Sequence, residues 1–456
     1  MTLAAAEHRE EPQARWVCGD NFGLAIPADP ETLLDGGPEL LTTAFRASGA
    51  LDEDNRVTRI VEAEEFFGGG TGRKLLLTVA YERPGPGLPD QLFVKFSRHF
   101  DNELWDRGRF MMVSEANFAV LSRAPGFPVP VPLCLFADVE AGSATGLIIT
   151  ERLTYGRDGV EPLHPKCLDH LLADPVEHYR AIVRGLAKVS GAHRGGRLAP
   201  EFDERFPHDP ALASAAFGLH ASQDDLLRWA DRMFEFIERN PNLFADHLRS
   251  PALREQLVAD IPDVVAAQDR IRAVLTGEPD FVAFAHWNAN IDNCWFERDA
   301  DGELRCGFID WANAGPASVA QSILGAISGA EADVWRDHLD ELLAVFVDEY
   351  AAQGAPRLDH RELRLHVLLL AALSSLGFAM GAPVAIRREM GDVSALTGPR
   401  DEAFHDHDNA RVQLHMMTNL LENWQTFALG DLVREVAGAG RPDVAARADQ
   451  RPSTSS

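Results

Sequence analysis

The pattern of apolar residues changes along the chain, and this change constrains the fold more than any other feature. Between residues 56 and 153, glycine and proline turns separate runs rich in β-branched and aromatic residues, which are RVTRIVEAEEFF, RKLLLTVAYE, QLFVKFS, VPVPLCLFADVE and LIITERL. Such runs predict β-strands. FMMVSEANFAVLSRA, which lies among them, has apolar residues at helical spacing. Together they predict a small α+β lobe with an antiparallel sheet and an inserted helix.

Beyond about residue 165 the apolar spacing is that of helices. The first helix opens with Asp174 as its N-cap and Pro175 at its first helical position. Further helices are predicted for DDLLRWADRMFEFIERN, EADVWRDHLDELLAVFVDEY, LRLHVLLLAALSSLGFAM and ARVQLHMMTNLLENW. Two short strands interrupt them, FVAFA before His286 and LRCGFI before Asp310. We therefore predict a two-lobed α+β fold, whose cleft would bind a ligand.

Domain boundaries follow from the same pattern. We expect an N-terminal extension over residues 1–37 and an N-lobe over residues 38–153, which begins with a short amphipathic helix at Pro38. The C-lobe would cover residues 154–435. The tail, residues 436–456, carries few large apolar groups and is expected to be disordered.

The charge of the chain limits its partners. Among 456 residues, 43 are Lys or Arg and 70 are Asp or Glu, which gives a net charge of −27. This balance argues against a general affinity for nucleic acids or anionic membranes. It suits a cationic or neutral small molecule, although it would equally serve solubility.

Cysteine usage and the most apolar segment bear on location. The five cysteines show no CxxC pair and no paired spacing with histidine, so neither a zinc site nor a disulfide framework is expected, and a reducing cytoplasm fits best. The run VLLLAALSSLGFAMGA is interrupted by two serines and is short for a membrane span. We expect it to form a buried helix, and the segment MTLAAAEHREEP has no signal-peptide core.

Two polar segments contain the residue types of a phosphate-transfer site. FAHWNANIDN ends at Asn293, and FIDWANAG contains Asp310. The two residues flank a predicted hairpin with a turn at Asp301-Gly302, so we expect them to lie close together. Amide and carboxylate oxygens are ligands that Mg²⁺ prefers.

A lysine and a glutamate upstream complete this pattern. Lys95 lies within a predicted strand, and Glu115 lies on the helix that follows. Phosphoryl transfer requires phosphates held in place, metal charge and a positioned acceptor, and a strand lysine paired with a helix glutamate is one way to hold the phosphates. Taken alone, the two residues could equally be solvated charges.

These residues together resemble the aminoglycoside-phosphotransferase and choline-kinase-like families, which have a protein-kinase-like fold. The layout is similar to that of the ecdysteroid-kinase-like branch, and the resemblance covers roughly residues 40–430 by the order of elements. It implies that Lys95 contacts the phosphates of ATP while Glu115 pairs with it. It also implies that Asn293 and Asp310 hold Mg²⁺.

The resemblance assigns further nucleotide-binding residues. The segment TERL, with Glu151 and Leu153, would be the hinge whose backbone meets adenine. The segment GGGTG, with Gly69, Gly70 and Gly72, would cover the phosphates. A glycine-rich turn between strands is common, and this one lacks the Gly-Lys-Ser/Thr ending of a Walker A motif.

The predicted catalytic loop departs from the pattern of these families. His286 would shape the loop, but Asn288 stands where the catalytic Asp belongs. Asn accepts a hydrogen bond through its amide oxygen but cannot take up a proton. Asp292 could compensate, although a role in stabilising the turn is the alternative. The acidic residue that braces the loop is also missing, with Val319 near its place.

Three functions remain open on this evidence. The favoured one is an ATP- and Mg²⁺-dependent phosphotransferase that acts on a small-molecule hydroxyl, with weakened or altered catalysis. The second is an inactive kinase-like protein that binds a nucleotide or another ligand, and the third is transfer of a nucleotidyl group. His193 is expected to be a structural histidine, and the polar run FHDHDN is expected to be a helix start rather than a metal site. Substrate identity and oligomeric state are not readable from the sequence.

Overall fold

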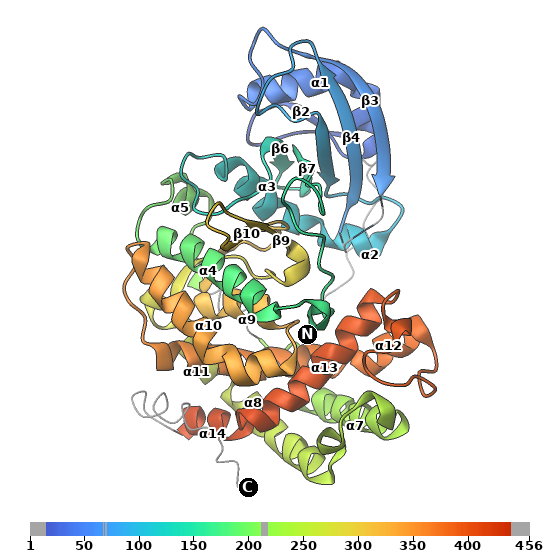
Figure 1. Cartoon of the computed structure of the whole chain (residues 1–456), viewed down its shortest axis with the longest axis vertical. Helices are drawn as coiled ribbons and strands as arrows, with labels where there is room; N and C mark the ends of the chain where they lie inside the picture. The colour runs from blue at the N-terminus through green and yellow to red at the C-terminus, as the bar shows by residue number, and fades with distance from the viewer. Residues whose placement is uncertain (1–14, 67, 69–70, 211–217, 439–456) are drawn as a thin grey trace. The chain divides into compact units, whose positions relative to one another are not determined.

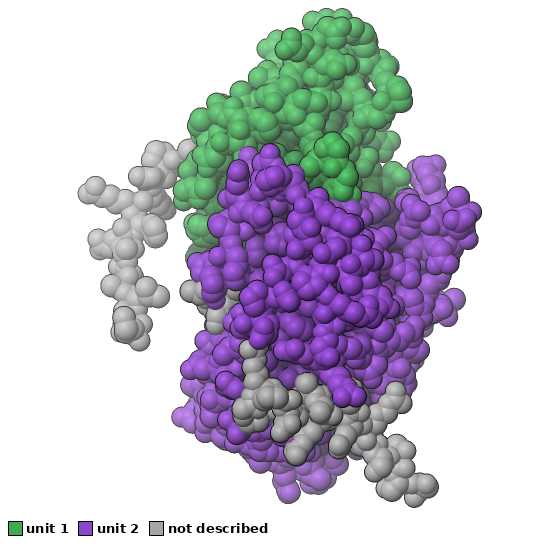
Figure 2. Space-filling model, turned by 90° about the vertical axis from the view of Figure 1, so that its left-hand side faces the viewer, with its two compact units in different colours: residues 1–127, 131–154, 309–314 green, residues 128–130, 155–308, 315–456 purple. Residues whose placement is uncertain are grey.

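The computed structural model describes residues 15–66, 68, 71–210 and 218–438 (Figure 1). The chain divides into two compact units, shown in Figure 2. Unit 1 comprises residues 1–127, 131–154 and 309–314, and unit 2 comprises residues 128–130, 155–308 and 315–456. The predicted α+β class is confirmed, because a small antiparallel-sheet part is followed by a larger, mostly helical part.

Unit 1 is built on a five-stranded antiparallel sheet with the strand order β3-β4-β5-β7-β6. Its strands are β3 (Val57–Phe66), β4 (Arg73–Tyr81), β5 (Gln91–Phe96), β6 (Cys134–Glu140) and β7 (Thr145–Glu151). The first four lie within runs that the sequence predicts as strands, and β7 begins two residues before the predicted run LIITERL. A separate pair of short strands precedes the sheet, β1 (Trp16–Cys18) and β2 (Ala25–Pro27).

Helices cover the two faces of this sheet (Figure 1). Helix α1 (Pro30–Ala47) contributes Leu41 and Phe45 to the core on one face. Helix α3 (Met111–Leu121) contributes Met112 and Ala116 to the core on the other face. The short helix α2 (Glu103–Asp106) lies between β5 and α3 in the chain.

The predicted helix from Pro38 is present as the second part of α1, and a helical first part that the sequence did not predict precedes it. Helix α1 begins at Pro30, because the Asp29 side chain accepts a hydrogen bond from the Thr32 backbone N–H. At Gly37 the helix kinks, with a φ of 60°. Glycine adopts that conformation readily, so Gly37 separates the first helical part of α1 from the part that Pro38 begins.

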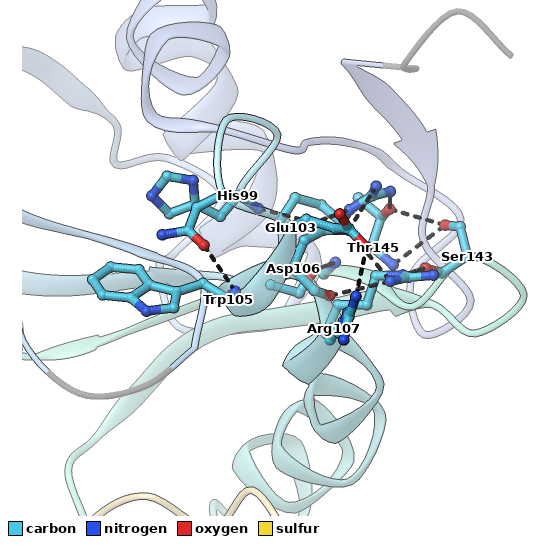
Figure 3. Close-up of polar contacts among 12 residues, drawn as sticks. His99, Glu103, Trp105, Asp106, Arg107, Ser143 and Thr145 are labelled. Atoms are coloured by element: carbon cyan, nitrogen blue, oxygen red, sulfur yellow. Dashed lines mark hydrogen bonds and ion pairs between the residues drawn. The ribbon is translucent and has the colours of Figure 1, made fainter. Parts of the chain in front are cut away.

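A polar network fixes the segment between β5 and α3 (Figure 3). The Asp106 carboxylate accepts hydrogen bonds from Arg98 Nε at 2.8 Å and from the His99 backbone N–H at 3.0 Å. Arg98 also donates to Thr145 Oγ1, which ties this segment to the start of β7. Burial alone would raise the pKa of Asp106, but these donors lower it. The network therefore holds the end of the strand that carries Lys95.

Unit 2 is mostly helical. Its helices are α4 (Pro175–Arg194), α5 (Glu201–Arg205), α7 (Gln223–Arg239), α8 (Pro251–Thr276), α9 (Val319–Ile327), α10 (Ala332–Ala352), α11 (His360–Ala379), α12 (Ala382–Met390), α13 (Asp408–Thr426) and α14 (Leu429–Gly438). Helix α4 has the predicted cap, because the Asp174 carboxylate accepts a hydrogen bond from the Glu177 N–H at 3.0 Å. Helices α5, α8, α9, α12 and α14 are not among the predicted helices.

The most apolar helix, α11, packs within unit 2. It is long and apolar enough to cross a membrane by length and composition, but most of it is buried against α9, α13 and other helices of this unit. This agrees with the buried helix that the sequence predicts.

Two short strand pairs interrupt the helices of unit 2. β8 (Val282–Ala285) pairs with β11 (Gly315–Ser318), and β9 (Cys294–Arg298) pairs with β10 (Leu304–Phe308). Gly302 has a φ of 85° in the predicted turn of the second pair. Strand β11 is not predicted from the sequence.

Candidate functional site

Lys95 of unit 1 lies in a cage of two carboxylates. Its Nζ lies 2.7 and 2.8 Å from the two oxygens of Glu115 on α3 and 3.1 Å from Asp310 Oδ1. The Lys95 side chain is 10% exposed and that of Glu115 is 12% exposed, so water screens this pair weakly. Burial alone would lower the pKa of Lys95, but the two carboxylates outweigh burial and raise it. The ammonium is therefore charged and held in one position.

A second buried lysine lies beside Lys95. Lys74 of β4 is paired with Lys95 of β5 in the register of the sheet, and directly paired residues point to the same face. Lys74 Nζ donates to the Thr71 carbonyl at 2.6 Å and lies 5.9 Å from the ring centroid of Trp105. Burial, and then the positive charge of Lys95, lower the pKa of Lys74 to about 8. Lys74 is not among the predicted site residues.

The alternation of the strands places both lysines on the α3 face. In β5, Leu92, Val94 and Phe96 point into the core that includes α1. Lys95 is out of phase with them and is paired with Ile148, which belongs to the core that includes α3. The same alternation in β4, read from the sequence, is the signal that could have identified Lys74.

Asp310 has an uncommon backbone conformation, with a φ of 59°. Few residues other than glycine adopt this region, and aspartate is one of the more tolerant. Trp311, the next residue, stacks on Phe118 of α3 with 3.9 Å between ring centroids and 12° between planes. The stacking fixes residues 309–314 against the helix that carries Glu115, and so positions the Asp310 carboxylate at Lys95.

The other predicted nucleotide-binding residues are only partly described. Gly69 and Gly70 lie outside the described residues. Gly72 has a φ of 60°, and a Cβ there would lie 1.8 Å from the Phe96 carbonyl oxygen, so glycine is required by close packing on β5. Glu151 Oε1 accepts a hydrogen bond from the Leu133 N–H at 2.8 Å. An adenine-binding role for Glu151 and Leu153 stays a prediction.

The loop between β8 and β9 in unit 2 carries the predicted catalytic residues. His286 is buried, and its Nδ1 accepts a hydrogen bond from the Asn288 backbone N–H at 3.2 Å. This bond fixes the ring and places the proton of a neutral imidazole on Nε2. This contact ties His286 to the turn of the loop, and its role in a catalytic loop stays a prediction.

The side chain of Asn288 is held by a neighbour that sequence analysis did not select. Its Oδ1 accepts a hydrogen bond from Asn290 Nδ2 at 2.8 Å, and Asn290 Oδ1 accepts one from the Ser328 hydroxyl. An amide oxygen has two lone pairs, so Asn288 Oδ1 keeps capacity for a second donor. The oxygen is thus oriented by the protein and is suited to accept a hydrogen bond, but it cannot act as a base.

The two predicted metal ligands belong to different units. In unit 2, Asn293 Nδ2 donates to the Asn288 carbonyl at 2.8 Å, which orients the amide and leaves its oxygen as the end available for a cation. In unit 1, the Asp310 side chain is 38% exposed. Both offer the oxygen donors that Mg²⁺ prefers, so their chemistry fits this ion. Their joint role as ligands stays a prediction.

Asp292 faces a lysine that was not predicted. Lys166 Nζ lies 3.5 Å from Asp292 Oδ1, and both side chains are partly exposed. An ion pair of this kind can steady the loop. Val319, the residue near the place of the missing brace, is the first residue of α9 and is fully buried.

The two remaining polar candidates have structural environments. His193 Nδ1 accepts a hydrogen bond from the Phe284 N–H, its Nε2 lies 3.1 Å from Asp203 Oδ1, and burial lowers its pKa. This is the structural histidine that the sequence predicts. In the run FHDHDN, Asp408 begins α13 and pairs with Arg411, as expected for a helix start.

Solved structures that are similar to this chain include small-molecule kinases and phosphotransferases. A choline kinase from Cryptosporidium parvum is 12% identical with a TM-score of 0.44, over 90% of this chain and 100% of the kinase. A spectinomycin phosphotransferase, solved with ADP and spectinomycin, is 12% identical with a TM-score of 0.34, over 79% of this chain and 94% of that chain. An aminoglycoside phosphotransferase from Streptomyces rimosus is 16% identical with a TM-score of 0.31, over 73% and 97%.

Both classes of enzyme that the sequence resembles are thus among the similar structures. No protein-family model matches the sequence, and no curated protein matches it.

Proposed function

We propose that the protein is an ATP- and Mg²⁺-dependent phosphotransferase that acts on a hydroxyl group of a small molecule. The observation that carries this proposal is the buried ammonium of Lys95, which Glu115 and Asp310 hold within 3.1 Å of their oxygens. The buried ammonium of Lys95 is held in one position, which suits it to bind the phosphates of a nucleotide. The partly exposed carboxylate of Asp310 beside it suits the metal ion that accompanies those phosphates.

The residues would divide the work as follows. Lys95 binds the phosphates, and Glu115 keeps its ammonium in place. Asp310 and Asn293 would hold Mg²⁺, which supplies positive charge to the phosphates when it is bound. Asn288 orients the acceptor hydroxyl through Oδ1, whose direction Asn290 sets. The five cysteines are all free, which supports the further proposal that the enzyme works in a reducing compartment such as the cytoplasm.

The main alternative is a protein that binds a nucleotide without catalysis. Asn288 favours this alternative, because an amide cannot accept the proton of the acceptor hydroxyl. Loss of a general base costs typically ~10²–10⁴ in rate, whereas positioning and charge are retained. Slow turnover is therefore the expected result.

A turnover assay with an Asn288→Asp variant tests this proposal. Release of ADP from Mg·ATP is measured with a panel of choline-like alcohols, aminoglycosides and apolar alcohols. We expect slow turnover by the wild type and at least a ~10-fold increase in the variant, since a base is restored. The variant also keeps an oxygen that can accept the hydrogen bond from Asn290.

Asn290→Asp is the matched control, because it adds the same charge two residues away and removes the donor to Asn288. It should not increase turnover. Nucleotide binding with no turnover by either the wild type or Asn288→Asp, over the whole panel, would support the binding protein and contradict the enzyme.

A further inference from the structure

Three metal-ligating side chains meet in unit 2, at a place that the proposed reaction does not use. Glu161 Oε2 lies 3.0 Å from His164 Nε2 and 2.9 Å from His178 Nε2. The three ligand atoms all lie within 4.8 Å of one another, and no other such group was found among the residues that the structure describes. We call Glu161, His164 and His178 the His–Glu triad.

The hydrogen-bond geometry of His178 calls for either a proton or a metal ion between His178 and Glu161. Its Nδ1 lies 2.9 Å from the backbone carbonyl oxygen of Asp174, and a carbonyl only accepts, so Nδ1 carries a proton. A neutral His178 then presents the lone pair of Nε2 to the Glu161 carboxylate, which is also an acceptor. Two acceptors 2.9 Å apart repel each other unless a proton or a metal ion lies between them.

The surroundings of the triad hold its members in place. His178 is in the first turns of α4, and the Glu161 N–H donates to the Phe296 carbonyl of β9 at 2.8 Å. Phe296 packs against both imidazoles, with centroid distances of 4.8 Å to His178 and 5.7 Å to His164. The His178 side chain is 7% exposed, and Glu161 is the most open member at 26%. The site is therefore rigid, is backed by an apolar ring and is reached from the Glu161 side.

We propose that the His–Glu triad binds a divalent transition-metal ion of the zinc class, with Nε2 of both histidines and a Glu161 oxygen as ligands. Two imidazoles and a carboxylate form a donor set of zinc sites that leaves a further position for water. The bond from His178 Nδ1 to a backbone carbonyl is the outer contact that metal-bound histidines make in most such sites. Mg²⁺ prefers oxygen donors, so the triad is distinct in chemistry from the proposed Asn293 and Asp310 pair.

The dimensions of the triad suit this ion. A tetrahedral ion ~2.0–2.1 Å from each ligand atom holds those atoms ~3.3–3.4 Å apart. The two pairs that include Glu161 lie at 2.9 and 3.0 Å and the two imidazole nitrogens lie within 4.8 Å of each other, so the ion would be admitted by rearrangement of the three side chains. Bound metal would connect the loop at residues 161–164 to α4.

Metal binding by the untagged full-length protein tests this inference. The protein is stripped with a chelator, given zinc in slight excess, dialysed and analysed for metal content, and its melting temperature is compared with and without zinc. We expect about one zinc ion per chain and a higher melting temperature, since an ion that binds only the native state stabilises it. The same concentration of Mg²⁺ should give a smaller shift.

Variants locate the bound ion. His164→Gln and Glu161→Gln remove one ligand each from the more open side chains of the triad, and circular dichroism of the metal-free proteins checks their fold. We expect each to weaken zinc binding by at least the ~10–100-fold that loss of an outer contact costs. His247→Gln is the control, because His247 makes a 2.9 Å pair with Glu422 without a third ligand. It should bind zinc as the wild type does.

Two results would overturn the inference. A wild-type protein without stoichiometric zinc would show that a proton, rather than a metal ion, lies within the triad. Equal zinc content in the wild type, Glu161→Gln and a folded His164→Gln would place the ion elsewhere on the chain. Neither result depends on phosphotransferase activity. The metal site can therefore be disproved without disproving the proposed function, and the reverse also holds.

Discussion

At the scale of single residues, the two lysines on the α3 face differ in their electrostatic environment. The positive charge of Lys95 is balanced by the carboxylates of Glu115 and Asp310, whereas Lys74 donates to a backbone carbonyl and lies near an aromatic ring. A charged group without a close carboxylate is costly to bury. Lys74 therefore destabilises the folded protein, and it is also a second cation beside the proposed phosphate site.

This difference predicts how a Lys74→Met variant responds to pH. The pKa of Lys74 falls from 10.5 to about 8 on folding, so below pH 8 its charged form costs roughly 3 kcal/mol of stability. The cost disappears as pH rises from 8 to 10.5, because the unfolded state binds the extra proton in that range. We expect Lys74→Met to unfold at higher denaturant concentration than the wild type at pH 7, with a smaller advantage at pH 9.5.

Urea unfolding at both pH values measures this effect. Lys188→Met, at a partly buried position on α4, controls for the substitution itself. The claim that the charge of Lys74 destabilises the fold would be contradicted if Lys74→Met increased stability equally at pH 7 and pH 9.5. A loss of stability in this variant at pH 7 would also contradict it.

At the scale of elements, the segment after β10 matters because it joins α3 through an aromatic stack. Trp311 is 3% exposed, stacks on Phe118 and also meets Phe127 edge-on. We expect Trp311→Ala to lower the free energy of unfolding by about 3–5 kcal/mol, as is typical for a buried tryptophan. The same variant should weaken nucleotide binding, since the segment carries Asp310.

Denaturant unfolding followed by a nucleotide titration checks both effects. Trp16→Ala provides the comparison, because Trp16 is 42% exposed on β1 and its loss should cost less than about 1 kcal/mol. Equal costs for the two tryptophans would mean that the stack contributes little.

Local sequence pattern predicted the elements that depend on local signals. The five strands of the main sheet coincide with runs rich in β-branched and aromatic residues, and α4 has its predicted cap and first-turn proline. Helix α8 was not predicted, and it contains Pro262 in its interior, a residue that usually marks a helix boundary. The helical part of α1 before Gly37 was not predicted, whereas the break at Gly37-Pro38 is present as a kink.

Part of the candidate site could also be predicted from the sequence. The pairing of Lys95 with Glu115 is as predicted, because it needs only a strand followed by a helix. Lys74 requires knowledge of which strand is paired with β5, and the Lys166 contact of Asp292 spans a long stretch of chain. The His–Glu triad likewise joins a loop to the start of α4, and the sequence spacing of its three residues does not match a metal-binding motif. Contacts between side chains from different elements are thus the part of the site that the sequence pattern could not predict.

At the scale of the whole molecule, each unit has its own part of the proposed chemistry. Unit 1 contains Lys95, Glu115 and Asp310, and unit 2 contains the asparagine loop with Asn288 and Asn293. The predicted N-lobe began at residue 38, whereas Ile26 and Leu33 also belong to the core of unit 1. The net charge of −27 suits a cationic substrate, which the wide panel of acceptors would reveal.

The most direct test of the account is the effect of Mg·ATP on the melting temperature of the wild type and of Lys95→Met. A ligand at 100 times its dissociation constant stabilises the native state by about 2.7 kcal/mol. We predict a clear increase for the wild type and for Lys188→Met, and little or none for Lys95→Met relative to its own nucleotide-free melting temperature. No increase in the wild type, or an equal increase in Lys95→Met, would contradict the claim that the Lys95 cage binds the nucleotide.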